Sequence, residues 1–108
     1  MTAALRALAS ITKNLARDLA ADQILVNAVA PGTALTGGVT GAIRAAGGDP
    51  SDPEGSYAIM AERYGAHIDL GRIAFPEEIA SVVAFCASKS NTFMTGSHIN
   101  VDGGSDFT

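Results

Sequence analysis

Apolar residues recur at helical spacing through the first part of the chain. In TAALRALASITKNLARDLAA, residues 2–21, leucines and an isoleucine return every three to four positions, and the charged residues lie mostly off that stripe. This pattern predicts an amphipathic helix with one apolar face. The many alanines favour the helix and would also let another helix approach it closely.

The next apolar stretch is continuous rather than periodic. ILVNAVA, residues 24–30, is too short for a helix and is closed by Pro31. A continuous apolar run is typical of a strand buried on both faces, as in a parallel sheet, and a proline cannot donate to the ladder. SHINV, residues 97–101, is the second expected strand, and the turn sequence DGG follows it.

Between the two expected strands the pattern changes twice. Residues 37–56 are rich in Gly, Asp, Pro and Ser and predict a loop with one short helix near 39–46. Residues 57–66 could form a second short helix. PEEIASVVAFCAS, residues 76–88, predicts a further helix, because proline is tolerated in a first helical turn and the two glutamates suit the positive end of the helix dipole. Helices and strands therefore alternate, which indicates an α/β fold.

Composition narrows the class of protein. The 108 residues suit one domain, and a formal net charge of −4 argues against non-specific nucleic-acid binding. The single cysteine, Cys86, permits no internal disulfide, so a reducing, cytoplasmic setting is expected. No apolar run approaches the ~20 residues of a membrane span. The two histidines, His67 and His98, have no partner at metal-ligand spacing, and no metal site is expected.

Four sequence motifs occur along the chain in a characteristic order and at characteristic spacings: TKNLARDLA, VNAVAPGTALT, LGRIAFPEEIASVVAFCAS and TGSHINVDGG. Together they resemble the C-terminal portion of a short-chain dehydrogenase/reductase of the classical type. The resemblance implies that residues 1–108 are the C-terminal part of a Rossmann-like doubly wound parallel sheet, with about two strands and flanking helices. It also implies that residues 37–69, approximately, form a substrate lid within an NAD(P)-binding domain.

The resemblance assigns a cofactor role to the turn after the first strand. In the family this turn lines the nicotinamide of NAD or NADP, which here implicates Pro31, Gly32, Ala34 and Thr36. A glycine at this place lets the backbone approach a flat ligand, because it has no Cβ. The alternative for Pro-Gly alone is an ordinary turn that ends a strand.

Three residues of the expected lid could contact a substrate. Met60 and Tyr64 are one helical turn apart, and Tyr57 is a similar case. Each of them could instead pack on the core. The resemblance implies a small carbonyl compound or secondary alcohol as substrate.

The catalytic residues of the family do not appear in this chain. Counted back from Pro31 without a gap, the tyrosine of Tyr-x-x-x-Lys falls on Met1 and the lysine on Leu5. The glycine-rich phosphate turn is also absent, so no catalytic residue is assigned. The chain is therefore expected to be inactive alone. The resemblance also implies a homo-oligomer, because regions corresponding to helices 2–21 and 76–88 commonly form subunit contacts in the family. The alternative is a non-catalytic interaction module that self-associates through helices 2–21 and 76–88.

Overall fold

The computed structural model describes residues 3–105, which form two compact units. Residues 3–30 and 80–101 make the first unit, and residues 31–79 and 102–105 make the second. The chain passes from one unit to the other at Pro31, between Ile79 and Ala80, and at Asp102.

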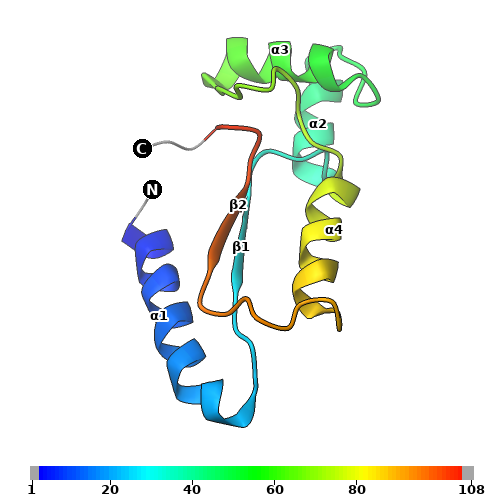
Figure 1. Ribbon diagram of the computed structural model, residues 1–108. Coiled ribbons are helices and arrows are strands. Elements are labelled where there is room, and N and C mark those ends of the chain that lie inside the picture. Colours follow the sequence, from blue (N-terminus) through cyan, green and yellow to red (C-terminus); the bar gives the residue numbers. More distant parts are fainter. Residues whose placement is uncertain (1–2, 106–108) are drawn as a thin grey trace. The chain divides into compact units, whose positions relative to one another are not determined.

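A two-stranded parallel sheet forms the centre of the first unit (Figure 1). Its strands are β1 (Ala28–Pro31) and β2 (His98–Val101). On one side of the sheet lies α1 (Ala3–Leu19), which continues into the short 3-10 helix η1 (Ala20–Asp22). The greater part of α4 (Pro76–Ala87) lies on the opposite side. The expected α/β order, with two parallel strands and flanking helices, is confirmed.

The first strand begins four residues later than predicted. Residues 24–27 are not a strand, because side chains there replace part of the backbone ladder. The Asn27 amide donates to the Met94 carbonyl at 2.9 Å and its oxygen accepts from the Ser97 N–H at 3.0 Å. The Val26 N–H donates to the Thr95 hydroxyl at 3.0 Å. These hydrogen bonds join residues 26–27, which precede β1, to residues 94–97, which precede β2, without continuous strand pairing.

The face of the sheet that α1 covers is the best buried part of this unit. Thr12 and Ala16 of α1 are buried, and so is Ala28 of β1. The Ala28 N–H donates to the Ser97 carbonyl, and in a parallel ladder this bond places Ala28 beside His98 with both side chains on one face. Both ring nitrogens of His98 are buried and have no hydrogen-bond partner among the described residues.

The α4 face of the sheet is much more open. No residue of α4 is buried, and Val83 and Phe85 are 48% and 47% exposed. The apolar composition of PEEIASVVAFCAS correctly predicts the helix, but the described chain leaves much of its apolar surface uncovered.

The second unit is built from two short helices around a small core. They are α2 (Gly37–Ala45) and α3 (Pro53–Tyr64). Four buried residues form the core cluster, with part-buried Val39, Tyr57, Ile59 and Met60 packed against it; the four are Leu35, Ile43, Ile68 and Ile73.

The helix α3 begins four residues before the predicted start at residue 57. The Asp52 carboxylate accepts the Gly55 N–H at 3.1 Å, and Pro53 occupies the first helical turn. Both are standard helix-start features, so the signal was present in the sequence DPEG. The helix ends at Gly65, whose φ of +66° is the left-handed conformation common at helix C-termini.

Candidate cofactor turn and substrate lid

The turn after β1 begins with a close approach between two backbones. A Cβ placed on Gly32 would lie 2.7 Å from the Cα of Asp102, the first residue after β2. Real Cβ atoms do not come that close to backbone, so only glycine fits at position 32 without movement. The two strand ends therefore meet at Gly32 and Asp102, at the carboxyl edge where open α/β sheets bind ligands.

The residues that follow are held in an extended conformation by a short bridge. The Leu35 N–H donates to the Ala74 carbonyl at 2.9 Å, and the Ala74 N–H donates to the Thr33 carbonyl at 3.2 Å. An isolated parallel bridge thus joins Ala34 to Ala74. Leu35 points into the core, and Ala34 is half-buried while Thr36 is exposed. Pro31, Gly32, Ala34 and Thr36 therefore lie together along one fixed segment.

Thr36 stands at the N-terminus of α2 with an unused hydroxyl. It occupies the N-cap position, yet its side chain makes no capping hydrogen bond, and no described residue binds the hydroxyl. Gly37 and Gly38 follow, both exposed, and a Cβ at either position would meet nothing within 4 Å. Helix N-termini with accessible N–H groups favour anions and amide or phosphate oxygens. The segment can thus offer a hydroxyl and backbone N–H groups to a ligand.

The three expected lid residues lie in different surroundings on α3. The Tyr57 hydroxyl accepts a hydrogen bond from the Ile68 N–H at 3.2 Å, and Tyr57 and Met60 both pack against the core cluster. Tyr64 is 63% exposed. Tyr57 and Met60 are part-exposed and pack on the core, as the alternative expectation stated. Tyr64 is exposed and could reach a ligand. Their contact with substrate stays a prediction.

The positions that correspond to the family's acid–base pair carry no such groups here. Leu5 lies in α1, and Met1 lies outside the described residues. Within residues 3–105, no group of three or more His, Cys, Asp or Glu side chains could hold a metal ion. His67 instead pairs with Asp69 at 2.8 Å, with both side chains largely exposed.

A hydrogen-bonded ion pair that the sequence pattern did not predict lies where the chain enters α4. The Arg72 guanidinium donates to the Glu78 carboxylate through its two terminal nitrogens, at 2.8 and 2.7 Å. Glu78 also accepts the Phe75 N–H at 2.8 Å. The hydrogen bonds from Arg72, followed by that from Phe75, lower the pKa of Glu78 to about 2. A glutamate at the third helical position, binding back to the residue before the helix, was a recognisable signal.

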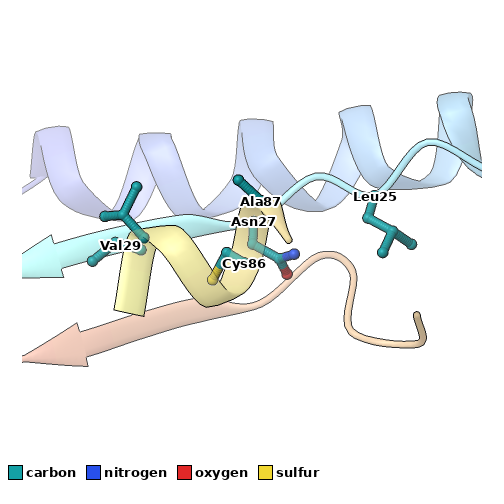
Figure 2. Close-up of a pocket in the computed structure, with 6 residues that line it drawn as sticks. Leu25, Asn27, Val29, Cys86 and Ala87 are labelled. Atoms are coloured by element: carbon teal, nitrogen blue, oxygen red, sulfur yellow. The ribbon is translucent and has the colours of Figure 1, made fainter. Parts of the chain in front are cut away.

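An open pocket of about 420 Å³ lies in the first unit, between the start of β1 and α4 (Figure 2). Its lining is mainly apolar and contains no charged side chain: Leu25, Asn27, Val29, Val83, Cys86 and Ala87. The Asn27 side chain is already engaged by backbone groups, as described above. The pocket therefore offers apolar surface and one thiol, but no acid or base.

The order of elements, with two parallel strands and helices on both sides of the sheet, is that of a portion of a parallel α/β domain. The sequence model of the family described as "Enoyl-(Acyl carrier protein) reductase" matches residues 1–106. The chain belongs to this family of short-chain dehydrogenases/reductases, which use NAD or NADP. The predicted family and Rossmann-like fold class are thereby confirmed.

Individual relatives agree with this assignment. Over 101 residues the chain is 38% identical to a diacetyl reductase, (S)-acetoin forming, of Staphylococcus aureus strain Mu50, covering 94% of this chain and 38% of the relative. A short-chain dehydrogenase family protein from Francisella tularensis has a solved structure with 39% identity and a TM-score of 0.67, covering 91% and 39% of the two chains.

A second solved structure bears on the cofactor. The blue fluorescent protein from a metagenomic library, in complex with NADPH, is 33% identical, with a TM-score of 0.65. The match covers 92% of this chain and 34% of that chain. The present chain thus spans between a third and two fifths of the length of these relatives.

Proposed function

We propose that this chain is the nicotinamide-side portion of an NAD(P)-dependent oxidoreductase that acts on a small carbonyl compound or secondary alcohol. The observation that supports this most directly is the segment 31–36, with Gly32 closed against Asp102 and the Thr36 hydroxyl, which no residue among 3–105 binds, at the start of α2. When bound, the nicotinamide supplies or accepts the hydride.

Four residues would hold that end of the cofactor. Pro31 and Gly32 would lie against the flat nicotinamide ring, since no side chain extends from position 32. The backbone around Ala34 and the hydroxyl of Thr36 would bind the polar groups beside it. The Thr36 hydroxyl has no partner among residues 3–105, so it would exchange only a bond to water for a bond to the cofactor.

The substrate would lie between this turn and α3. Tyr64, 63% exposed, would have most of its surface available to close over a ligand. Tyr57 and Met60 would instead form the floor, because they are already packed against the core cluster.

The chain is proposed to be inactive alone. Reduction of a carbonyl needs a proton donor near the substrate oxygen, and the corresponding family position falls on Met1, with Leu5 in place of the lysine. Neither side chain can donate a proton. These groups and the diphosphate site would come from other sequence.

A second candidate function is a non-catalytic, self-associating module. It is favoured by three large apolar side chains along one face of α1: Leu8, Ile11 and Leu15, with exposed fractions of 45%, 54% and 45%. Exposed apolar patches of this kind often mark interfaces. Homo-oligomer formation is part of both proposals, and the single cysteine is consistent with the reducing cytoplasm in either case. No helix among residues 3–105 is both long enough and apolar enough to cross a membrane.

Binding of reduced cofactor by the 108-residue chain separates the two candidates. NADPH and NADH are titrated into the purified chain, and cofactor fluorescence and heat of binding are followed. Saturable binding with a Kd in the micromolar range, about −8 kcal/mol, supports the cofactor turn. A folded oligomer that binds neither cofactor at millimolar concentration supports the interaction module.

A further inference from the structure

The turn that follows β2 touches two parts of the second unit that are distant in sequence. Asp102 lies against Gly32 of the candidate cofactor turn, at the 2.7 Å approach described above. The next residue, Gly103, lies against the end of the lid segment: a Cβ there would be 2.9 Å from the Cγ2 methyl of Ile68. The Gly103 carbonyl also accepts the Leu70 N–H at 3.0 Å.

The turn itself is internally braced. The Asp102 carboxylate accepts the Gly104 N–H at 3.0 Å, and the Asp102 carbonyl accepts the Ser105 N–H at 3.2 Å. Gly103 and Gly104 both have left-handed backbone conformations, with φ of +63° and +85°. Residues with side chains adopt these angles at a cost, so two consecutive glycines allow a tight turn that presents its backbone on both sides.

The contact with Ile68 extends to α3. Ile68 is 4% exposed, and its N–H is the donor to the Tyr57 hydroxyl. A displacement of Ile68 would therefore lengthen the hydrogen bond that fixes Tyr57. Protein interiors are close-packed. A shift at one contact in this series is therefore transmitted to the next contact.

We propose that the turn 102–104 is a positioning element that couples the candidate cofactor turn to the lid helix α3. Gly32 and Asp102 form one contact, Gly103 with Ile68 and Leu70 forms the second, and Tyr57 receives the displacement on α3. Movement of the backbone at residues 31–36 thus changes the placement of the lid. The relevance to catalysis rests on the proposed function, whereas the coupling itself needs no bound cofactor.

Amide hydrogen exchange of the full 108-residue chain, followed by NMR, tests the coupling. The perturbing variant is Gly32→Ala, whose new methyl group would have its three nearest contacts with atoms of Asp102. The matched control is Gly38→Ala, where a Cβ meets nothing within 4 Å. The Gly48 N–H, which donates to the Ile43 carbonyl at 2.9 Å, serves as the reference amide for overall stability of the unit.

The expected result is a selective change at a distance. In Gly32→Ala the Ile68 and Leu70 amides exchange at least about fivefold faster relative to Gly48, as expected for weakening one hydrogen bond. In Gly38→Ala the ratio stays as in the unaltered chain. Equal acceleration of all three amides, or acceleration confined to residues 31–36, overturns the proposal.

A second pair of variants tests the other contact and decides the matter if Gly32→Ala does not fold. Gly103→Ala is compared with Gly47→Ala, which has a similar positive φ of +82° but an open surrounding. Only Gly103→Ala should accelerate exchange at Ile68. Adding Ile68→Leu, which removes the Cγ2 methyl, should restore the ratio, because the steric conflict disappears while backbone strain remains. No restoration means that strain alone explains the effect, and the coupling is then refuted.

This outcome is independent of cofactor binding. A chain that fails to bind NADPH but shows the selective change at Leu70 retains the coupling and loses the proposed function. A chain that binds NADPH and shows no selective change retains the function and loses the coupling.

Discussion

Arg72 and Glu78 face one another in a two-pronged ion pair that closes the turn before α4, with N–O distances of 2.8 and 2.7 Å. The pair joins the segment that follows the lid to the first turn of the helix. Both side chains keep partial contact with solvent, at 34% and 40% exposure. Its contribution to stability therefore comes from geometry and from the additional bond to the Phe75 N–H rather than from burial.

The first prediction concerns acid stability. The pKa of Glu78 is lowered to about 2 in the folded chain, so its contribution is complete above its ordinary value of 4.5 and disappears as the pH falls toward 2. We expect Glu78→Gln to be less stable than the unaltered chain at pH 7 and to lose less stability on acidification. Urea unfolding between pH 7 and pH 2.5 measures this.

Glu77→Gln is the matched control for that experiment. Glu77 is the adjacent carboxylate of the same helical turn. The Glu77 variant should follow the pH dependence of the unaltered chain. A Glu78 variant with an unchanged acid profile would show that the ion pair does not persist in solution.

The second prediction concerns the cofactor turn. Thr36→Val removes the unpaired hydroxyl at the start of α2, and we expect NADPH binding to weaken by roughly 0.5–1.5 kcal/mol, about 2- to 12-fold in Kd. Thr40→Val is the control, because the Thr40 hydroxyl already donates to the Gly37 carbonyl at 3.1 Å. Equal affinities of the Thr36 variant and the unaltered chain would reduce the turn to a simple strand end.

The main elements of the fold could be predicted from sequence because burial imposes periodicity. The leucine stripe of α1 and the Pro-Glu-Glu start of α4 both correspond to helices in the structure. The start of β1 could not be predicted, because the Asn27 side chain forms hydrogen bonds with residues near position 95 in place of strand pairing. This replacement of strand pairing by side-chain hydrogen bonds depends on a contact between segments about 70 residues apart, which no local sequence pattern reveals.

The candidate site was predictable to a similar degree. Pro31, Gly32, Ala34 and Thr36 are adjacent in sequence and so had to lie together, whereas the contact of Gly32 with Asp102 depends on how the two strands end. For Tyr57, spacing alone left both a core position and a ligand contact open. The hydrogen bond to Ile68 that holds its hydroxyl is visible only in the folded chain.

The third prediction concerns turnover. With Met1 and Leu5 at the acid–base positions, the 108-residue chain should not interconvert alcohols and ketones with either cofactor. Steady-state absorbance at 340 nm, across a panel of small secondary alcohols and ketones, measures this. Turnover in the ordinary enzymatic range of about 1–1000 per second would mean that other residues supply the proton.

The fourth prediction concerns His98 in β2. Both ring nitrogens are buried without a partner among the described residues, and a buried unsatisfied polar group costs about 1–3 kcal/mol. We expect His98→Leu, which removes these atoms and keeps an apolar side chain, to raise the free energy of unfolding by about 1 kcal/mol. Denaturant unfolding at pH 8 measures the change.

His67→Leu is the control for that measurement. The His67 side chain is 71% exposed and pairs with Asp69 at the surface, so its replacement should change stability by less than about 0.5 kcal/mol. A His98 variant that is less stable than the unaltered chain would indicate that the ring nitrogens find partners in solution.

The last prediction concerns association. A two-stranded sheet is a poor unit for independent stability, and here it leaves the apolar face of α1 and the α4 side uncovered. We expect the purified chain to be a tight oligomer or a loosely packed, aggregation-prone state, as judged by light scattering and amide exchange. Ile11→Glu places a charge within the exposed stripe and should shift the chain toward monomer. Ser10→Glu adds the same charge off the stripe and should leave the mass unchanged. A monomer that unfolds cooperatively, with strong amide protection at Ala28, whose N–H donates to the Ser97 carbonyl, would show that the described residues stabilise themselves without a second copy.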